Sequence, residues 1–211
     1  MKRSAGLLGA VALIAAVATA VRADDSLLCF GDDNEGRVKG CTALIDRGGF
    51  GNEKMAEIYA RRALAYSLLG QYGTAIRDYD VAIQMLPNFA VALNNRAWAY
   101  FRWGKAAIGL PDVEKSLQLE PYAGHTLDTR AHIRQVLGDP KGALSDYSKA
   151  MFHGGTEMIK LYQCGLTEAR LYDGRIDGIW RRELQTALEK CVVRTSCDPL
   201  PADEHCRPAT S

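Results

Sequence analysis

The sequence predicts an all-α protein built as a solenoid of stacked helical hairpins. The stretch 56–123 repeats itself with a period of 34 residues, and a weaker third copy follows in 124–155. The matching positions of the first two copies include Tyr66 and Tyr100, Gly70 and Gly104, Asp78 and Asp112, and Pro87 and Pro121. A fixed period of this length is typical of stacked helix pairs. The apolar fraction of 47% supplies enough hydrophobic residues for packed cores.

Residues 1–23 predict a secretory signal peptide. Lys2 and Arg3 precede an uncharged apolar run, and small residues allow cleavage after Ala23, with Ala20 as a second site. An uncleaved membrane anchor is the alternative, but the apolar run is shorter than the roughly 20 residues that span a bilayer. We therefore expect an exported protein, in the periplasm, with no membrane span after cleavage.

The chain contains six cysteines, and all of them follow the predicted cleavage site. An even number behind an export signal predicts disulfides in an oxidising compartment. Pairing of sequence neighbours gives Cys29–Cys41, Cys164–Cys191 and Cys197–Cys206. The pairing among the last four cysteines stays open.

Residues 24–51 precede the repeats and predict an irregular half-repeat. Val38, Cys41 and Leu44 lie at helical spacing within a short helix over 37–46. A Cys29–Cys41 bond would join this helix to the apolar turn before it. Terminal repeats are usually atypical, so this segment is expected to act as a disulfide-closed N-terminal cap.

The repeat region 52–155 consists of three predicted helix pairs, 56–89, 90–123 and 124–155. In the first pair, Gly70 ends one helix and Pro87 blocks continuation of the next. The second pair has Pro111 inside its return helix. Because proline is tolerated in the first turn of a helix, we expect that helix to start late, with Pro111 near its beginning.

These repeats resemble tetratricopeptide repeats. The residues that carry the resemblance are Ala63, Tyr66, Leu69, Gly70, Tyr72, Ala75, Tyr79, Ala82 and Pro87, and in the second copy Ala97, Tyr100, Trp103, Gly104 and Pro121. The resemblance implies that the first helix of each pair lines a concave groove for a peptide or helix of a partner protein. The groove residues it implies are Glu57, Arg61, Leu64, Asn94, Trp98, Phe101, Arg102, Asp128, His132 and Gln135.

Two aromatic residues of the second copy are the leading candidates for contact with a partner. Exposed aromatic side chains on solenoids often mark binding sites, so Trp98 and Phe101 would act as anchors. The alternative is that both rings only pack against the next repeat. Asn94 would bind the partner's backbone.

Residues 156–195 predict a small three-helix module, followed by a disulfide-closed tail in 196–211. The module resembles the peptidoglycan-binding domain through Gln163, Leu166, the run 172–174, the run 176–179 and Ala187-Leu188, with departures at Arg181, Leu184 and Cys191. The resemblance implies contact with cell-wall material by Tyr172, Asp173, Asp177, Trp180, Arg181 and Arg182. The alternative is that the Asp-Gly pairs only set turn geometry and that the module caps the array.

The sequence predicts no catalytic residues, no metal site and no cofactor. None of the four histidines has a nucleophile or carboxylate at a recognised motif spacing. A zinc set of Cys191, Cys197, His205 and Cys206 is less consistent with export than disulfides are. The net charge of +1 gives no indication of nucleic-acid binding.

Together these features predict a non-enzymatic protein-interaction scaffold of the bacterial cell envelope. The alternative is a cell-wall tether, in which the C-terminal module binds peptidoglycan while the repeats hold a partner protein.

Overall fold

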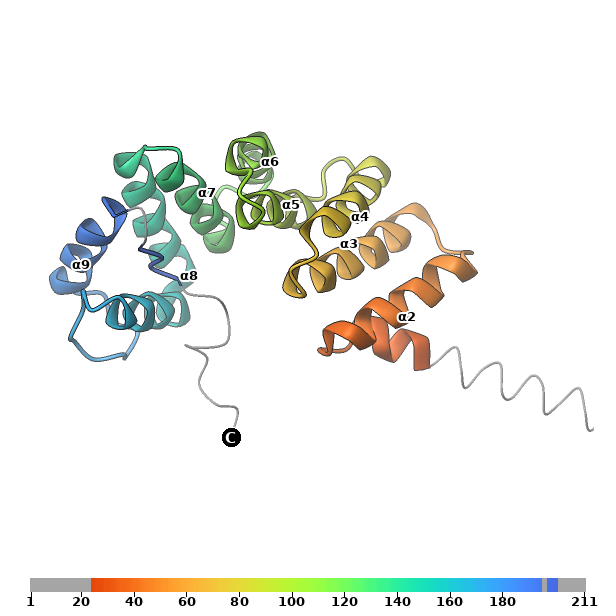
Figure 1. The fold of residues 1–211 in the computed structure, drawn as a ribbon, viewed down its shortest axis with the longest axis horizontal. Coiled ribbons are helices and arrows are strands. Elements are labelled where there is room, and N and C mark those ends of the chain that lie inside the picture. Colours follow the sequence, from red (N-terminus) through yellow and green to blue (C-terminus); the bar gives the residue numbers. More distant parts are fainter. Residues whose placement is uncertain (1–23, 195–196, 201–211) are drawn as a thin grey trace, which may run out of the picture. The chain divides into compact units, whose positions relative to one another are not determined.

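Every regular element in the described part of the chain is an α-helix. The structure, a computed structural model, describes residues 24–194 and 197–200, and within them no helix is long and apolar enough to cross a membrane. The signal peptide, most of the 196–211 tail and Cys206 lie outside these residues. The chain divides into two compact units, unit 1 up to Pro87 and unit 2 from Asn88 (Figure 1). The predicted all-α helical-hairpin solenoid is confirmed.

Unit 1 begins with a short helical segment, residues 24–30, that packs against α2 (Asn34–Arg47). The disulfide Cys29–Cys41 joins the two, which is the predicted pairing. Gly40 lies where they cross, because a Cβ there would come within 2.5 Å of the Cys29 backbone nitrogen. The small N-terminal cap is therefore closed by a covalent bond and a close backbone contact.

The first repeat is an antiparallel pair of helices, α3 (Asn52–Leu68) and α4 (Tyr72–Met85). Gly70 separates them with a positive φ of 74°, a conformation that glycine adopts without steric cost. The next amide, that of Gln71, donates a hydrogen bond back to Tyr66 O. This is the usual glycine-containing end of a helix, and Gly104 and Gly138 repeat it in unit 2.

The second repeat pairs α5 (Ala90–Arg102) with α6 (Ala106–Leu119) at the start of unit 2. Gly109 allows the close approach of these helices, since a Cβ there would lie 2.8 Å from Ala97 O. Ser116 is buried and donates a hydrogen bond to Ala90 O at 2.9 Å. Gly109 and Ser116 therefore both serve the packing of this pair.

The expectation of a late start for the second helix of this repeat is wrong. Helix α6 begins at Ala106, so Pro111 lies inside the helix and beyond its first turn. Pro111 is exposed, and one missing backbone hydrogen bond is tolerated because α6 packs against α5 through Gly109 and Val113 on either side of it.

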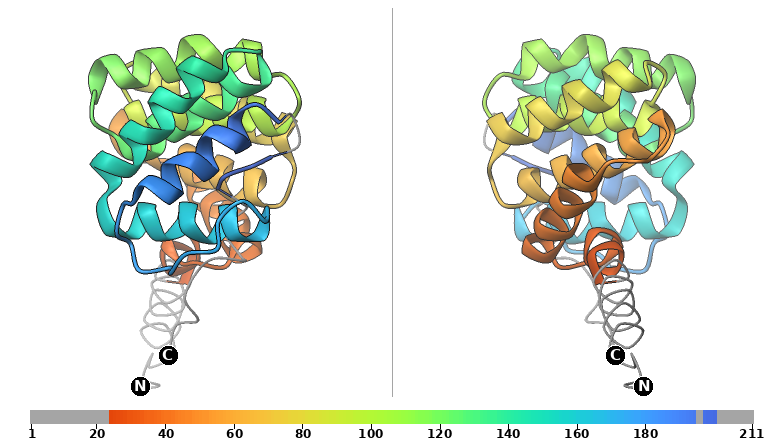
Figure 2. Two further views of the ribbon diagram at one scale, coloured as in Figure 1. Left: turned by 90° about the vertical axis from the view of Figure 1, so that its left-hand side faces the viewer. Right: turned by 90° about the vertical axis from the view of Figure 1, so that its right-hand side faces the viewer.

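The third repeat and the C-terminal module share a continuous hydrophobic core. Helix α7 (Gly124–Val136) precedes α8 (Pro140–Glu168), which bends at Gly155, where φ is 65° and ψ is −154°. Helix α9 (Arg182–Val192) packs against α8, and Figure 2 shows it beside both halves of that bent helix. The core residues come from α7, both halves of α8, and α9, and include Ala131, Tyr147, Met158, Leu166, Leu184 and Leu188.

The described part of the C-terminal module contains two helical segments rather than the expected three. The loop between these segments is held by Gln163 on α8. The buried side chain of Gln163 accepts hydrogen bonds from the backbone amides of Asp177 and Gly178. The Gln163 amide also donates to Ile179 O at 3.1 Å. One buried glutamine thus forms hydrogen bonds with the backbone groups of an irregular loop, so these groups do not require helical hydrogen bonds.

The predicted pairings Cys164–Cys191 and Cys197–Cys206 are wrong. Cys191, on α9, is bonded to Cys197, which follows it by six residues. The segment after α9 turns back over α7 instead of continuing away from the module, and this return brings Cys197 to α9. The prediction of a C-terminal tail closed by a bond between Cys197 and Cys206 is wrong for the same reason.

An ion pair joins the two helices of every repeat. The pairs are Arg62–Asp78, Arg96–Asp112 and Arg130–Asp146, each with two guanidinium-to-carboxylate hydrogen bonds of 2.7–2.9 Å. The arginines lie 34 residues apart, and so do the aspartates. All six side chains are at most 19% exposed, which makes the pairs much more sensitive to loss of a partner than surface ion pairs are.

Replacing Asp146 by Asn should lower the free energy of unfolding by about 3 kcal/mol, because Arg130 and Arg134 would both lose a buried anionic partner. Urea unfolding followed by circular dichroism measures the change. The control Asp173→Asn removes an exposed carboxylate of the same unit and should stay within about 0.5 kcal/mol of wild type. Equal stability of the two variants would show that the ion pair does not stabilise the repeat.

Candidate functional site

Four side chains from α5 and α7 form a continuous face in unit 2. Trp98 and Phe101 lie on α5, and His132 and Gln135 occupy the same repeat positions on α7. The ring centroids of Trp98 and Phe101 are 5.0 Å apart and lie 5.3 and 5.4 Å from that of His132. We call these residues, with Asn94 and Arg102, the α5–α7 face.

Both predicted anchors are half-buried, so each serves packing and also keeps an accessible edge. The Arg102 guanidinium lies 5.7 Å from the centroid of the Trp98 ring and is itself exposed. On the side that faces His132, both rings pack against the next repeat, as the alternative interpretation expects. The remaining surface of Trp98 and Arg102 is available for contact with another molecule.

Asn94 carries a buried polar atom that lacks a partner. Its amide nitrogen donates to Asn95 Oδ1 at 3.3 Å, while its own Oδ1 accepts no hydrogen bond from any described residue. A buried acceptor without a donor costs roughly 1–3 kcal/mol. Since this oxygen is shielded from solvent, it is a local cost of packing and not an accessible contact point.

His132 is buried among α5, α7, α8 and the C-terminal segment. Its Nδ1 lies 2.9 Å from Asp128 O, and its Nε2 lies 2.9 Å from a carboxylate oxygen of Asp198. Burial alone would lower the pKa of His132, but the carboxylates of Asp128 and Asp198 outweigh it and raise the pKa to about 10. The ring is therefore an imidazolium at neutral pH, and both nitrogens donate.

The predicted groove residue Asp128 does not face an open groove. It is 4% exposed and accepts a hydrogen bond from the hydroxyl of Tyr162, on the far half of α8. Burial, together with Asp128, raises the pKa of Tyr162 well above its usual value, which keeps this hydroxyl protonated. Asp128 therefore serves as an internal counter-ion of His132.

Residues 197–200 of the chain itself cover the α7 part of the face. The side-chain amide of Gln135 donates to Cys197 O at 2.9 Å and to Arg194 O at 3.1 Å, and its Oε1 accepts from the Tyr147 hydroxyl at 2.8 Å. Pro199 is buried, and Leu200 packs at the edge of the shared core. The sequence places His132 and Gln135 on the correct face but gives no sign of this cover.

In unit 1, the predicted groove residues form a charged cluster on α3. Glu57 accepts from Lys54 at 2.8 Å and from Arg61 at 3.0 Å. Burial acts to raise the pKa of Glu57, but these two hydrogen bonds outweigh it and lower the pKa. Both cations also lie over the ring of Phe30, at 4.1 and 4.3 Å from its centroid, while Leu64 is half-buried.

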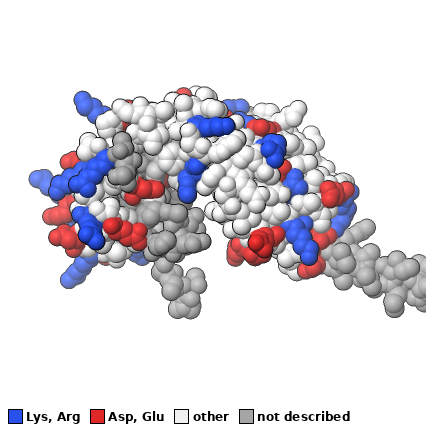
Figure 3. All heavy atoms as spheres, viewed as in Figure 1, with Lys and Arg blue, Asp and Glu red and all other residues white. Residues whose placement is uncertain are grey.

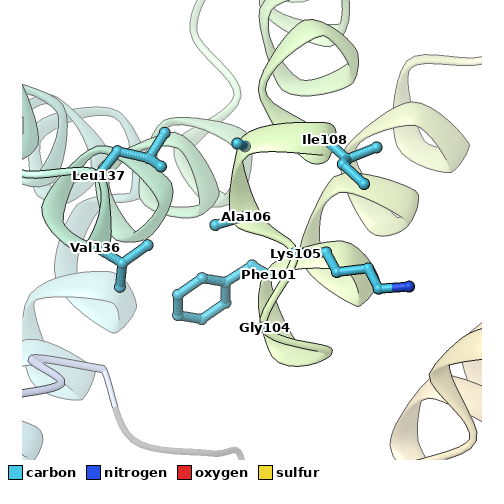
Figure 4. Close-up of a pocket in the computed structure, with 8 residues that line it drawn as sticks. Phe101, Gly104, Lys105, Ala106, Ile108, Val136 and Leu137 are labelled. Atoms are coloured by element: carbon cyan, nitrogen blue, oxygen red, sulfur yellow. The ribbon is translucent and has the colours of Figure 1, made fainter.

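A shallow apolar depression of about 380 Å³ adjoins the α5–α7 face. Its lining includes Phe101, Ile108, Val136 and Leu137 (Figure 4). Val136 and Leu137 are 54% and 47% exposed, and the Lys105 side chain points away from the depression. Phe101 was predicted from the sequence, whereas Ile108, Val136 and Leu137 were not, although hydrophobic residues near Gly104 and Gly138 are visible in it.

Half of the six residues expected to contact cell-wall material hold their own loop. Asp177 accepts two hydrogen bonds from Arg181, which lower its pKa, and Tyr172 is buried with its hydroxyl donating to Arg175 O. Trp180, Asp173 and Arg182 are exposed. On the face shown in Figure 3, acidic and basic side chains are interspersed over α8 and α9, so no single-sign surface is present there.

Curated proteins similar to this chain carry the name of the repeat. Tetratricopeptide repeat protein 37 of Xenopus laevis is 24% identical over 151 residues, which are 72% of this chain and 10% of that protein. The Hsp70-Hsp90 organizing protein of Triticum aestivum is 30% identical over 122 residues, 58% of this chain and 17% of that protein. Serine/threonine-protein phosphatase 5 of Homo sapiens is 27% identical over 129 residues, 59% of this chain and 26% of that protein. No protein-family model matches.

The similarity to these relatives and the 34-residue helix pairs indicate the same type of repeat. The repeats of this chain form a tetratricopeptide-type helical solenoid and are similar in sequence to proteins that carry this repeat. The chain spans only 10% to 26% of the length of the three relatives, so the likeness concerns the repeat region and not their whole activities.

In the described residues, no group of three His, Cys, Asp or Glu side chains is arranged to hold a metal ion.

The raised pKa of His132 predicts a loss of stability in alkaline solution. The pKa of His132 in the folded protein is about 10, above the ordinary value of 6.5. The charged ring therefore stabilises the folded state fully below pH 6.5, and this stabilisation disappears as the pH rises towards 10. Between these limits wild type should lose about 1 kcal/mol per pH unit relative to His132→Gln. Urea unfolding at pH 6 to 9 measures both proteins, and parallel profiles would contradict a charged His132.

Proposed function

We propose that this tetratricopeptide repeat protein is a non-enzymatic scaffold that binds an extended segment of a partner protein along the α5–α7 face. The observation that carries the proposal is the accessible edge of Trp98, which lies beside the exposed guanidinium of Arg102 and next to Phe101. Trp98 would pack on an apolar side chain of the bound segment. Aromatic residues and arginine, as in Trp98 and Arg102, dominate binding energy at protein interfaces.

The names of the relatives support binding of proteins rather than catalysis. The Hsp70-Hsp90 organizing protein of Triticum aestivum is named for two protein partners. One relative is a phosphatase, but this chain matches only 26% of its length. We therefore extend protein binding, and not phosphatase activity, to this chain.

We propose further that the protein works outside the cytoplasm, in the bacterial cell envelope. Supporting this, Cys29–Cys41 and Cys191–Cys197 are formed, and such bonds persist in oxidising compartments. The expected signal peptide in 1–23 agrees with it. We do not extend the proposal to peptidoglycan binding, because the Asp177 and Arg181 side chains are engaged with each other.

A photo-crosslinking amino acid at Phe101 should capture a defined protein partner from the native host, because the ring lies at the edge of the α5–α7 face. The same amino acid at Glu114, an exposed position on α6, serves as the control. Trp98→Ala should reduce capture from Phe101 at least fivefold, measured by mass spectrometry of the crosslinked peptides. Equal capture from both positions would contradict binding at this face.

Alkylation of unfolded protein, taken from its native location without reductant, should modify none of the six cysteines. The same protein after reduction should show all six, counted by intact mass. Six reactive thiols before reduction would overturn the proposed compartment, while leaving the binding face unaffected.

A further inference from the structure

The part of the α5–α7 face on helix α7 is already occupied by a segment of the same chain. Residues 197–200 follow α9 and are held on it by the Cys191–Cys197 bond. They lie more than 60 residues beyond α7 in sequence, yet they contact His132 and Gln135 directly. On α5, by contrast, Trp98 keeps an accessible edge among the described residues.

The contacts of this segment are those expected of a bound peptide. The Asp198 carboxylate lies against the His132 imidazolium, and the Gln135 amide donates to the main-chain oxygens of Arg194 and Cys197. Pro199 is buried, and Leu200 contacts the edge of the core. One charge, one backbone oxygen and two apolar side chains of the segment are thus recognised together, and the Arg194 oxygen just before it shares the Gln135 amide.

The recognition is also incomplete in a way that permits exchange. The Asp198 side chain is 51% exposed, so solvent reaches this carboxylate, whereas His132 is 3% exposed. Asp128 on the same helix has a carboxylate oxygen 3.4 Å from His132 Nδ1, so the ring keeps an anionic neighbour when Asp198 is displaced. Tyr147 and Tyr162 on α8 and the rings of Trp98 and Phe101 on α5 complete its surroundings, and none of these supplies a second anion.

We propose that residues 197–200 are an internal ligand, which holds the place of a partner peptide that carries an acidic side chain followed by apolar residues. This inference rests on the proposed function, whose partner it defines chemically: an extended acidic segment takes the place of Asp198 on α7 and continues over Asn94 and Trp98 on α5. The disulfide keeps the internal ligand at a high local concentration, so that an external peptide binds with reduced apparent affinity.

A synthetic peptide with the residue order of 195–201, with serine in place of Cys197 and a fluorescent label, tests the proposal. Binding to the oxidised mature protein is measured by fluorescence anisotropy. Asp198→Ala should bind the probe at least tenfold more tightly than wild type, because the internal ligand has lost its charged contact. Asp173→Ala makes the same change of charge at an exposed site and should leave probe binding unchanged.

Two further measurements separate recognition from non-specific loosening. A probe with Asn in place of its Asp should bind Asp198→Ala at least tenfold more weakly than the acidic probe. Adding Gln135→Ala to Asp198→Ala should weaken the acidic probe at least fivefold, with unchanged circular dichroism. Equal affinity of the two probes, or no gain in Asp198→Ala, would overturn the internal ligand.

The proposed function and this inference fail in different ways. If the probe never binds while crosslinking from Phe101 still captures a partner that depends on Trp98, the internal ligand alone is wrong. If the probe behaves as expected but crosslinking captures nothing above the Glu114 control, the internal ligand is supported and the proposed scaffold is wrong.

Discussion

The buried arginine–aspartate pair between the two helices of each repeat is the interaction on which the architecture depends. It occurs as Arg62–Asp78, Arg96–Asp112 and Arg130–Asp146, with the same two hydrogen bonds in each case. A shift of one helix along the other would leave both charges unpaired away from water, at a cost of several kcal/mol. The pair therefore fixes the alignment of the hairpin, and the small buried residues, such as Ala63 and Ala75, then allow close packing. Apolar contacts alone would tolerate several alignments.

The periodic part of the fold could be predicted because its causes are local and repeat. Gly70, Gly104 and Gly138 all have a positive φ and end helices at the expected positions. The sequence also shows the arginines and the aspartates at the same period. Matching aspartates indicate only a repeat, however, unless each is recognised as the ion-pair partner of the arginine 16 residues before it. Pro111 shows the limit of local rules: helix α6 starts before it because packing through Gly109 outweighs one lost hydrogen bond.

The occupied part of the site could not be predicted, because its cause lies far away in sequence. The resemblance to tetratricopeptide repeats implies His132 and Gln135 as groove residues, yet nothing near them in sequence indicates that residues 197–200 return to cover them. The misassigned cysteines have the same origin. Pairing by sequence neighbours assumes that the chain leaves the module after α9, whereas the chain turns back and Cys197 bonds to Cys191. A buried histidine between two carboxylates is a property of the tertiary structure.

The repeat separates residues that determine the fold from residues that determine recognition. The arginine–aspartate positions are identical in all three copies, while one position of the first helix changes from Leu64 to Trp98 to His132. That position contributes to the face and not to the helix-to-helix ion pair, so its chemistry can vary without loss of alignment. At His132 the change has a consequence, since a buried imidazolium requires anions close by and Asp128 supplies one from its own helix. The second anion comes from outside α7, because Asp198 of the returning segment places its carboxylate 2.9 Å from His132 Nε2.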